Sequence, residues 1–598
     1  MKFNKLWGIL LVICMLIVCL NTVSAADNST SMVETDNGNL AVENDVVFDA
    51  LEVSSDSDVI GAGNKWYVKA GAPSGGDGSE DKPYANIKAV TNNANYKEND
   101  IIYLMGGNTY KGSSNLGISL KENTTIMAYG NDNPIIDAQN SQSIFKISNS
   151  GITIKGLTFI HGGGTVDAAL NKWTGGAIYN TGDNLTVDNC TFKDPDTLTY
   201  GAGIFSNGKN TEIKNSYFTN NDASYGGAIA INGPNAKIIN NEFRQNSGVY
   251  GGAINIYDYG GALIENNTFV RNDANMGKNG YAGAIYARAG NNVIKNNKFD
   301  HNTAGSYGGA ICLVNPDNVV DNCTFTNNQI FKDSTSSNWG GAIYTQSPNN
   351  ITNSYFFNNA VRDNGGAIYV RGSDNLVENC TFEKNWAARG GAIYVAPMVG
   401  GNNITNPMIN NCTFNENGVD QSKGGAIFSW ALNTSVTNSK FNNNKAMAGG
   451  AILYQRGSNF LENDTFIGNV ANRYGGGAIA SARFGDTINN CTFKDNSAQG
   501  YGGAVSADYP TITDSQFINN DAYHGGAIFT IAANVSDSEF KDNTAADDWI
   551  ILAATKLTES NNDRQNQEVI SLNNEIYRYI DLIMILKGLL YLAIMLIV

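Results

Sequence analysis

Residues 308–328 read GGAICLVNPDNVVDNCTFTNN, and variants of this stretch recur along most of the chain. Its first element is Gly-Gly-Ala-Ile or a close variant, and each copy is followed by a second element that ends in Phe, from Phe192 to Phe540. The period is about 25 residues, which indicates a repeat architecture rather than separate globular domains. The fourteen copies of the first element start at Gly175, Gly201, Gly226, Gly251, Ala282, Gly308, Gly340, Gly365, Gly390, Gly424, Gly449, Gly476, Gly502 and Gly525.

Alignment of the copies on Phe shows which positions are constant. Five residues before it stands Val, Ile or Leu, as in Val320 before Phe325, and three before it stands Asn or Asp, as in Asn322. Side chains alternate between the two faces of a strand, so Val320 and Phe325 share an interior only if the chain bends between them. Asn tolerates left-handed backbone better than most residues, so Asn322 marks the bend.

These units predict an all-β fold, a single-stranded parallel β-helix with three short strands and three corners in each coil of about 25 residues. The runs are short and β-prone, and they lack a helical period of 3.6 residues. Stacked coils place equivalent positions about 4.8 Å apart. We therefore expect ladders of Asn side chains at the corners and a core that includes Val377, Cys380 and Phe382.

The ends of the chain differ from the repeats. Residues 1–25 have a basic start, an apolar run and small residues before Ala26, which is the pattern of a cleaved secretory signal. The apolar segment 582–598 is compatible with a membrane anchor, with a buried terminal helix, or with a truncated or altered tail. The expected regions are a signal at 1–25, a polar spacer at 26–63, a cap with a short helix and irregular coils at 64–163, the fourteen coils at 164–545, a linker at 546–581 and the apolar segment at 582–598.

Composition limits the classes of function. The net charge of -16 argues against nucleic acid as a partner, because phosphate binding needs clustered Lys and Arg. Only 3 His occur in 598 residues, so we expect no metal site and no cofactor. The six cysteines after residue 25 are expected to be core thiols, because five of them share one column two residues before Phe. Only Cys380 and Cys412 fall in adjacent coils, at a spacing poorly suited to a disulfide.

A carbohydrate-active β-helix enzyme, a polysaccharide lyase or hydrolase, is the main alternative to a binding protein. Such chemistry needs converging carboxylates. Asp547-Asp548 are neighbours that would point to opposite faces of a strand, and Asp194 and Asp196 flank a proline in an expected turn. His161, His301 and His524 lie in settings that look unrelated, and His161-Gly162-Gly163-Gly164 is best explained as a coil corner. We therefore predict no catalytic residue.

Glycosylation sequons occur in two kinds of place. Asn189 and Asn411 begin Asn-Cys-Thr triplets that the repeat itself could produce, which would leave them partly buried. Asn123 and Asn403 lie away from that column and are favoured as acceptors.

The pairing of Gly308-Gly309-Ala310-Ile311 with Phe325-Thr326-Asn327-Asn328 resembles the repeats of chlamydial polymorphic outer-membrane proteins. The Asn-Cys-Thr-Phe coils are also similar to the Asn-rich adhesin-like surface proteins of methanogenic archaea. The resemblance covers about residues 64–545. It implies a right-handed β-helix at the cell surface with an adhesive role.

The function expected from these features is binding by a secreted, surface-displayed protein, with cell-surface glycans or proteins of unknown identity as partners. A structural spacer of the cell envelope is a second alternative. The candidate binding residues are aromatic side chains near the Gly-Gly-Ala corner, which could form a stripe near the surface or merely stack on one another and stiffen the corner. They are Tyr200, Tyr225, Tyr250, Tyr281, Tyr307, Trp339 and Trp386.

Overall fold

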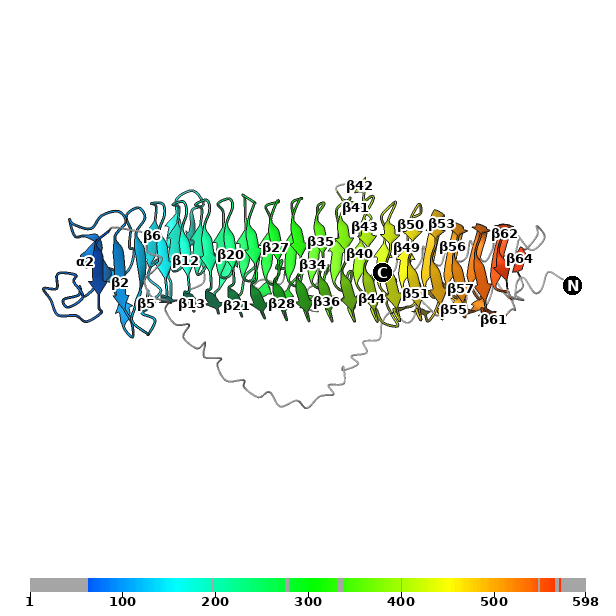
Figure 1. The fold of residues 1–598 in the computed structure, drawn as a ribbon, viewed down its shortest axis with the longest axis horizontal. Coiled ribbons are helices and arrows are strands. Elements are labelled where there is room, and N and C mark those ends of the chain that lie inside the picture. Colours follow the sequence, from blue (N-terminus) through cyan, green and yellow to red (C-terminus); the bar gives the residue numbers. More distant parts are fainter. Residues whose placement is uncertain are drawn as a thin grey trace, which may run out of the picture. The chain divides into compact units, whose positions relative to one another are not determined.

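The computed structural model describes residues 63–571, apart from 196–197, 275–278, 331–337, 400, 547–548 and 565–568. Within these residues, parallel strands wind into about 17 turns with three sheets per coil (Figure 1). The prediction of a parallel β-helix is therefore confirmed. The expected signal, the spacer before residue 63 and the apolar segment 582–598 lie outside the described residues.

One coil from the middle of the stack shows how the strands are arranged. Its four short strands are β26 (Ile285–Ala287), β27 (Val293–Lys295), β28 (Lys298–Asp300) and β29 (Thr303–Ala304). The first two strands belong to one sheet, and β28 and β29 belong to two others. Each pairs in parallel with its counterpart in the next coil, so that Phe299 lies opposite Phe325. The coil has the three expected faces, but the first face is built from two strand segments.

The first face is continuous towards the C-terminal end. There it is spanned by the single strands β53 (Ile479–Asn489), β56 (Val505–Thr513), β59 (Ile528–Ser536) and β62 (Ile551–Ser560). In upstream coils a residue with positive φ interrupts the face, such as Asn291 at 57°. The stretch Val505–Thr513 contains no residue with positive φ, whereas β53 stays continuous around Gly485, with φ of 85°.

The corners follow a spacing of five residues. In the coil of Phe299, the backbone is left-handed at Asn291, Asn296 and His301, with φ of 57°, 57° and 53°. The residue directly after each corner points inward and is buried, and so is the one three positions after it. This confirms the predicted bend at the Asn that lies three residues before Phe. It also shows that each face repeats the same five-residue pattern.

The Phe residues form one column in the core. Successive rings from Phe192 to Phe540 stack with centroids 4.7–4.9 Å apart. Phe382, Val377 and Cys380 are all buried, as predicted. The six cysteines between residues 190 and 491 are free and buried, so the expectation of core thiols is also confirmed.

A buried ladder of asparagines runs beside the Phe column, and we call it the inner asparagine ladder. Within it, the side-chain amide of Asn328 donates to Oδ1 of Asn359 at 3.0 Å and to the carbonyl oxygen of Phe299 at 3.1 Å. Its own Oδ1 accepts two hydrogen bonds from Asn302, from the backbone and side-chain nitrogens, both at 3.0 Å. The ladder comprises Asn221, Asn246, Asn272, Asn302, Asn328, Asn359, Asn385, Asn417, Asn444, Asn469, Asn496, Asn520 and Asn543.

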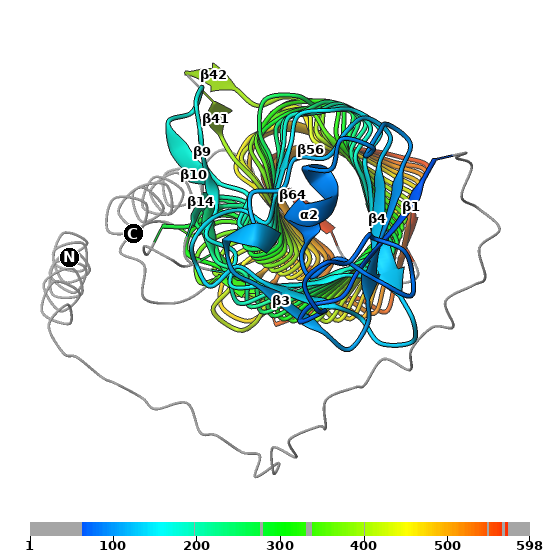
Figure 2. The same ribbon diagram turned by 90° about the vertical axis from the view of Figure 1, so that its left-hand side faces the viewer.

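A short helix covers the N-terminal end of the coil interior. Helix α2 (Ile87–Thr91) lies across this end in Figure 2 and buries Ile87 and Val90. Asn86 caps it, because its Oδ1 accepts a hydrogen bond from the backbone nitrogen of Ala89 at 3.0 Å. Strand β1 (Lys65–Val68) pairs with β2 (Ile101–Met105), and β2 pairs with β4 (Thr125–Tyr129), which begins the first face.

Replacement of one ladder asparagine tests how much the inner ladder stabilises the stack. We predict that Asn328→Ala lowers the free energy of unfolding by roughly 2–4 kcal/mol, because it leaves buried groups of Asn302 and Phe299 without partners. Asn327→Gly is the matched control, since Asn327 is the adjacent corner residue with φ of 56° and glycine keeps that conformation. Equal losses in chemical denaturation of the two variants would contradict the assignment.

Candidate functional site

The residues just before the Gly-Gly elements form a column that we call the ring column. Parallel backbone pairing joins Tyr200 to Tyr225, and further bridges continue through Tyr250, Tyr281 and Tyr307 to Trp339. Ring centroids of successive members lie 4.6–5.2 Å apart. Tyr200 is buried and the other five are half-buried, so the column lies at the surface but is not fully exposed.

A residue with positive φ follows each ring and makes this arrangement possible; it is Ala282, with φ of 63°, after Tyr281 and glycine after the other five rings. Gly226 has φ of 66°, and a Cβ atom there would clash with the carbonyl oxygen of Ile229. Only glycine permits this tight turn at low cost. The turn places a ring beside the outward side of the strand that follows, as Tyr200 shows by its edge contact with Phe205, with ring centroids 6.1 Å apart.

The faces of the rings contact one another rather than solvent. Four of the five successive pairs are close to parallel, with interplanar angles of 5–15°, and only Tyr281 and Tyr307 are steeply tilted at 61°. A ring in the middle of such a stack offers a ligand its edge and its phenol group, not its face. The geometry thus shows the stacking that the sequence analysis gave as one of two interpretations. A role of these residues in binding stays a prediction.

Burial favours the neutral form of four phenol groups in the column. It raises the pKa of Tyr200 to about 12, and it also raises the pKa values of Tyr225, Tyr281 and Tyr307. These hydroxyls are therefore protonated at physiological pH and can act as hydrogen-bond donors.

A second aromatic column continues the stack beyond Trp339. It consists of the residues directly after Gly-Gly-Ala-Ile in successive coils, Tyr344, Tyr369, Tyr394 and Phe428, which are all buried and have ring centroids 5.0–5.5 Å apart. Trp339 joins the two columns, because its ring stacks on Tyr369 at 4.9 Å. This column was not predicted from the sequence, although an aromatic residue directly after Gly-Gly-Ala-Ile in successive coils indicates it.

Two arginines lie on aromatic rings of this face. The guanidinium of Arg371 is 5.6 Å from the ring centroid of Trp339 and donates to the hydroxyl of Tyr344 at 3.2 Å. Arg288 lies 4.6 Å from the ring centroid of Tyr257. We call the ring column, the second column and these two arginines the aromatic face. Cations held on aromatic rings are partly desolvated, which strengthens their interaction with anionic groups.

Trp386 does not belong to the ring column. Its backbone pairs with Ala360, whereas the ring-column position of that coil is held by Arg389, which pairs with Asn364. Trp386 is exposed and lies four residues after Phe382, on the third face. The structure thus places Trp386 three residues before the ring-column position of its coil and not in the column of the tyrosines.

Two of the three histidines considered for catalysis, and Asp194, occupy structural corners, whereas His524 lies in strand β58 (Asp521–His524) with its ring stacked on Tyr501. His161 and His301 each lie two residues after the central residue of the second face, with φ of 52° and 53°, so their settings are equivalent rather than unrelated. His161 pairs with Asp137 at 2.9 Å, and His301 pairs with Asp300 at 3.0 Å. Asp194 is another left-handed corner residue. Asp196, Asp547 and Asp548 lie outside the described residues.

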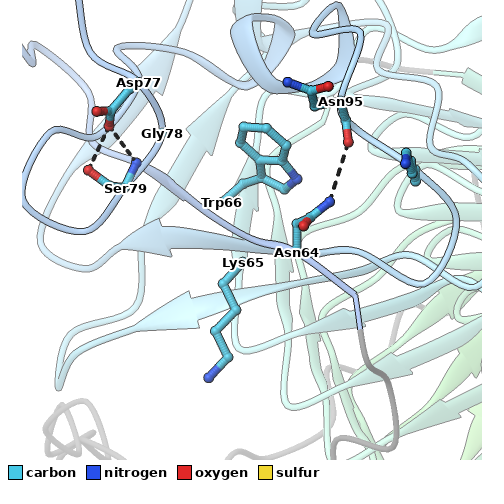
Figure 3. Close-up of a pocket in the computed structure, with 8 residues that line it drawn as sticks. Asn64, Lys65, Trp66, Asp77, Gly78, Ser79 and Asn95 are labelled. Atoms are coloured by element: carbon cyan, nitrogen blue, oxygen red, sulfur yellow. Dashed lines mark hydrogen bonds between the residues drawn. The ribbon is translucent and has the colours of Figure 1, made fainter.

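A wide pocket of about 480 Å³ lies at the N-terminal cap, lined by residues that include Asn64, Trp66, Asp77 and Asn95 (Figure 3). Asn64 donates to the backbone oxygen of Asn95 at 3.3 Å. The carboxylate of Asp77 accepts hydrogen bonds from the backbone and hydroxyl of Ser79, which lower its pKa. Asp77 is the only carboxylate among the lining residues, so the pocket does not hold the pair that glycoside hydrolysis requires.

Two carboxylates are buried inside the coils near the C-terminal end. Burial raises the pKa of Asp486 to about 6 and raises that of Asp464 well above its usual value. One oxygen of each carboxylate, and the buried hydroxyl of Tyr454, have no hydrogen-bond partner. The other oxygen of Asp486 accepts from the backbone and side chain of Asn459 at 2.9 and 2.8 Å. A second buried ladder lies seven residues before the core Phe residues and includes Asn292, which donates to Oδ1 of Asn318. Asp486 takes the place of an asparagine in this ladder.

No group of three or more His, Cys, Asp or Glu that could hold a metal ion is present among the residues that the structure describes. A helix long and apolar enough to cross a membrane is likewise absent from that part of the chain.

A family model described as right handed beta helix region matches residues 142–315, 227–396 and 306–466, together more than half of the chain. The chain therefore belongs to the right-handed β-helix family. The Chlamydia polymorphic membrane protein repeat matches residues 490–508, which confirms the resemblance to that repeat. The matched segment contains Phe493 of the core column, Asn496 of the inner ladder and the tight turn at Gly502. No curated protein sequence matches the chain.

Several solved structures are distantly similar. A PL6 alginate lyase in complex with a trisaccharide is 16% identical, with a TM-score of 0.38, over 64% of this chain and 86% of the lyase. The bacteriophage Phi29 gene product 12 N-terminal fragment is 12% identical, with a TM-score of 0.34, over 79% and 91%. PfbA, a surface adhesin of Streptococcus pneumoniae, is 14% identical, with a TM-score of 0.17, over 79% and 88%. Likeness at this level carries no argument about activity.

The buried charge of Asp486 generates a pH-dependent prediction. Because its pKa is higher in the folded chain than in the unfolded chain, its contribution to stability is full below about pH 4 and is lost as the pH rises through about 6. We predict that Asp486→Asn is more stable than the natural protein at pH 7, by about 2–3 kcal/mol. The difference should shrink towards pH 4 in denaturation curves. A difference that does not vary with pH would contradict the burial of a charge at this position.

Proposed function

We propose that this protein is a secreted, surface-displayed adhesin-like β-helix that binds cell-surface glycans or proteins through the side of its coils. The observation that carries the proposal is the aromatic face, in which ring edges, phenol groups and two arginines recur along one side of the stack. Aromatic residues and arginine are the side chains that contribute most to binding at protein surfaces.

The form of the aromatic face supports an extended partner rather than a small molecule. Its groups repeat from coil to coil, so a polymer or a large surface can contact several of them at once, and weak contacts add up to useful affinity. Tyr250, Tyr281 and Tyr307 offer hydroxyl groups, and Arg371 offers a cation that suits carboxylate or sulfate groups, whereas Arg288 already lies 3.7 Å from the carboxylate of Asp258.

Display at the cell surface is supported by two features of the sequence. Residues 1–25 have the pattern of a secretory signal, and residues 490–508 match a repeat of the chlamydial polymorphic membrane proteins. In this proposal the apolar segment 582–598 holds the protein to the membrane. The identity of the partner follows from a binding screen and not from the fold, since a fold does not imply a function.

Removal of the phenol groups tests the aromatic face without destroying its stack. We predict that the triple variant Tyr250→Phe, Tyr281→Phe and Tyr307→Phe keeps the melting temperature within a few degrees but loses binding to glycans or cells by at least about tenfold, by the loss of hydrogen bonds. The replacement of the same three residues by Ser removes the rings as well, and should lower both melting temperature and binding.

Tyr259→Phe is the matched control, because Tyr259 is 56% exposed but is not part of the aromatic face. Binding on a glycan array and to whole cells provides the measurement. Unchanged binding of both triple variants would show that the column is structural and would favour the envelope spacer. Release of unsaturated or shortened sugar products by the natural protein would instead favour the lyase or hydrolase.

A further inference from the structure

An exposed column of asparagines runs along the corner between the first face and the Phe face. Each lies three residues before a Phe of the core column. In seven coils the Asn is followed two residues later by Thr, which completes a glycosylation sequon. We call these residues the acceptor row: Asn189, Asn266, Asn322, Asn379, Asn411, Asn463 and Asn490.

We propose that the acceptor row carries N-linked glycans, arranged in a line along one edge of the coil stack. The proposal requires secretion, which the signal pattern at residues 1–25 indicates, but it does not depend on the proposed binding function. It concerns a different corner from the ring column, so both surfaces can be tested separately.

The corner geometry turns each acceptor outward. At Asn322 the backbone is left-handed with φ of 48°, and its side chain is exposed, while the next residue, Cys323, points into the core. Thr324 is again partly exposed, so acceptor and hydroxyl residue both reach the surface. Six of the seven acceptors are exposed, and Asn189 is half-buried. The Asn-Cys-Thr triplet at Asn411 is thus buried only at its middle residue, Cys412, while the acceptor itself is exposed.

The coil pattern does not require the threonine that completes each sequon. In the other coils the equivalent position is held by residues as different as Tyr217, Lys298 and Gln516. The inner asparagine ladder also lacks sequons. The residue two positions after each ladder member is Ala, Gly, Val or Ile, such as Ile330 after Asn328, and never Ser or Thr. Sequons are thus concentrated where an attached sugar would extend into solvent.

The modification is compatible with the hydrogen bonds of the row. The side-chain nitrogen of Asn379 donates to Oδ1 of Asn353 at 2.6 Å, and that nitrogen carries two hydrogens. In the transfer, Nδ2 attacks the anomeric carbon of a sugar activated as a lipid diphosphate. The new N–C bond forms, the bond from carbon to the diphosphate oxygen breaks with its electron pair leaving on the diphosphate, and one amide proton passes to a base. The second amide hydrogen remains for the hydrogen bond from Asn379 to Asn353.

Spacing limits how many acceptors can be occupied. Asn379 and Asn411 lie in adjacent coils, as do Asn463 and Asn490, and their side chains contact each other at 3.3 and 2.6 Å. Coils rise by about 4.8 Å, which is too little for two sugar chains side by side. Since one member of each pair excludes the other, the seven acceptors hold at most five glycans.

Glycopeptide mass spectrometry of the full-length protein purified from its own cells tests the proposal. We expect sugar masses on acceptor-row peptides, with the fractional occupancies of Asn379 and Asn411 adding up to no more than one. Thr324→Val should abolish modification at Asn322 while keeping a β-branched residue in the strand, whereas Thr324→Ser should retain it.

Two results would overturn the inference. Unmodified peptides at all seven acceptors in the secreted protein would show that the triplets only reflect the repeat, even if Asn123 or Asn403 carries sugar. Occupancies of Asn379 and Asn411 that add up to well above one would refute the exclusion between adjacent coils. Comparable melting temperatures of the two Thr324 variants would show that a loss of modification does not arise from misfolding.

Discussion

Burial of a polar side chain in this solenoid costs stability unless it finds a hydrogen-bond partner, which the coil above or below can supply. The inner asparagine ladder meets this condition, since each amide donates to the next coil and to a backbone carbonyl, and accepts two hydrogen bonds in return. This exchange works only at a coil spacing near 4.8 Å. The Phe column, the left-handed corners and the outer columns all depend on that spacing.

The same stacking that builds the core also builds the surface. A residue type that recurs once per coil becomes a continuous column, whether it points inward like Phe325 or outward like Tyr250. A column is therefore not by itself evidence of function. The aromatic face differs from a purely structural stack in the groups at its edge, which are neutral phenols and two arginines placed on rings.

The inward side of the coil could be predicted from the sequence, because alignment on Phe identifies which positions must be apolar or small. Phe382, Val377, Cys380 and the Asn ladders all follow from that alignment. The outward side of the coil was harder to predict from the sequence. Trp386 lies between a Phe strand and a Gly-Gly strand like the tyrosines, but it stands three residues before the ring-column position of its coil. The second aromatic column depends on the tight Gly-Gly turn, whose geometry becomes apparent only in three dimensions.

Hydrogen exchange of the backbone amides tests most directly whether the inner ladder holds the coils together. The backbone nitrogen of each ladder asparagine donates to Oδ1 of the next, so these amides should be among the slowest to exchange in the chain. The corner amides directly before them, such as that of Asn327, provide the internal comparison. Slow exchange of Asn302, Asn328 and Asn359 relative to other buried amides is the predicted result. Exchange of these three amides as fast as that of surface loops would contradict the account.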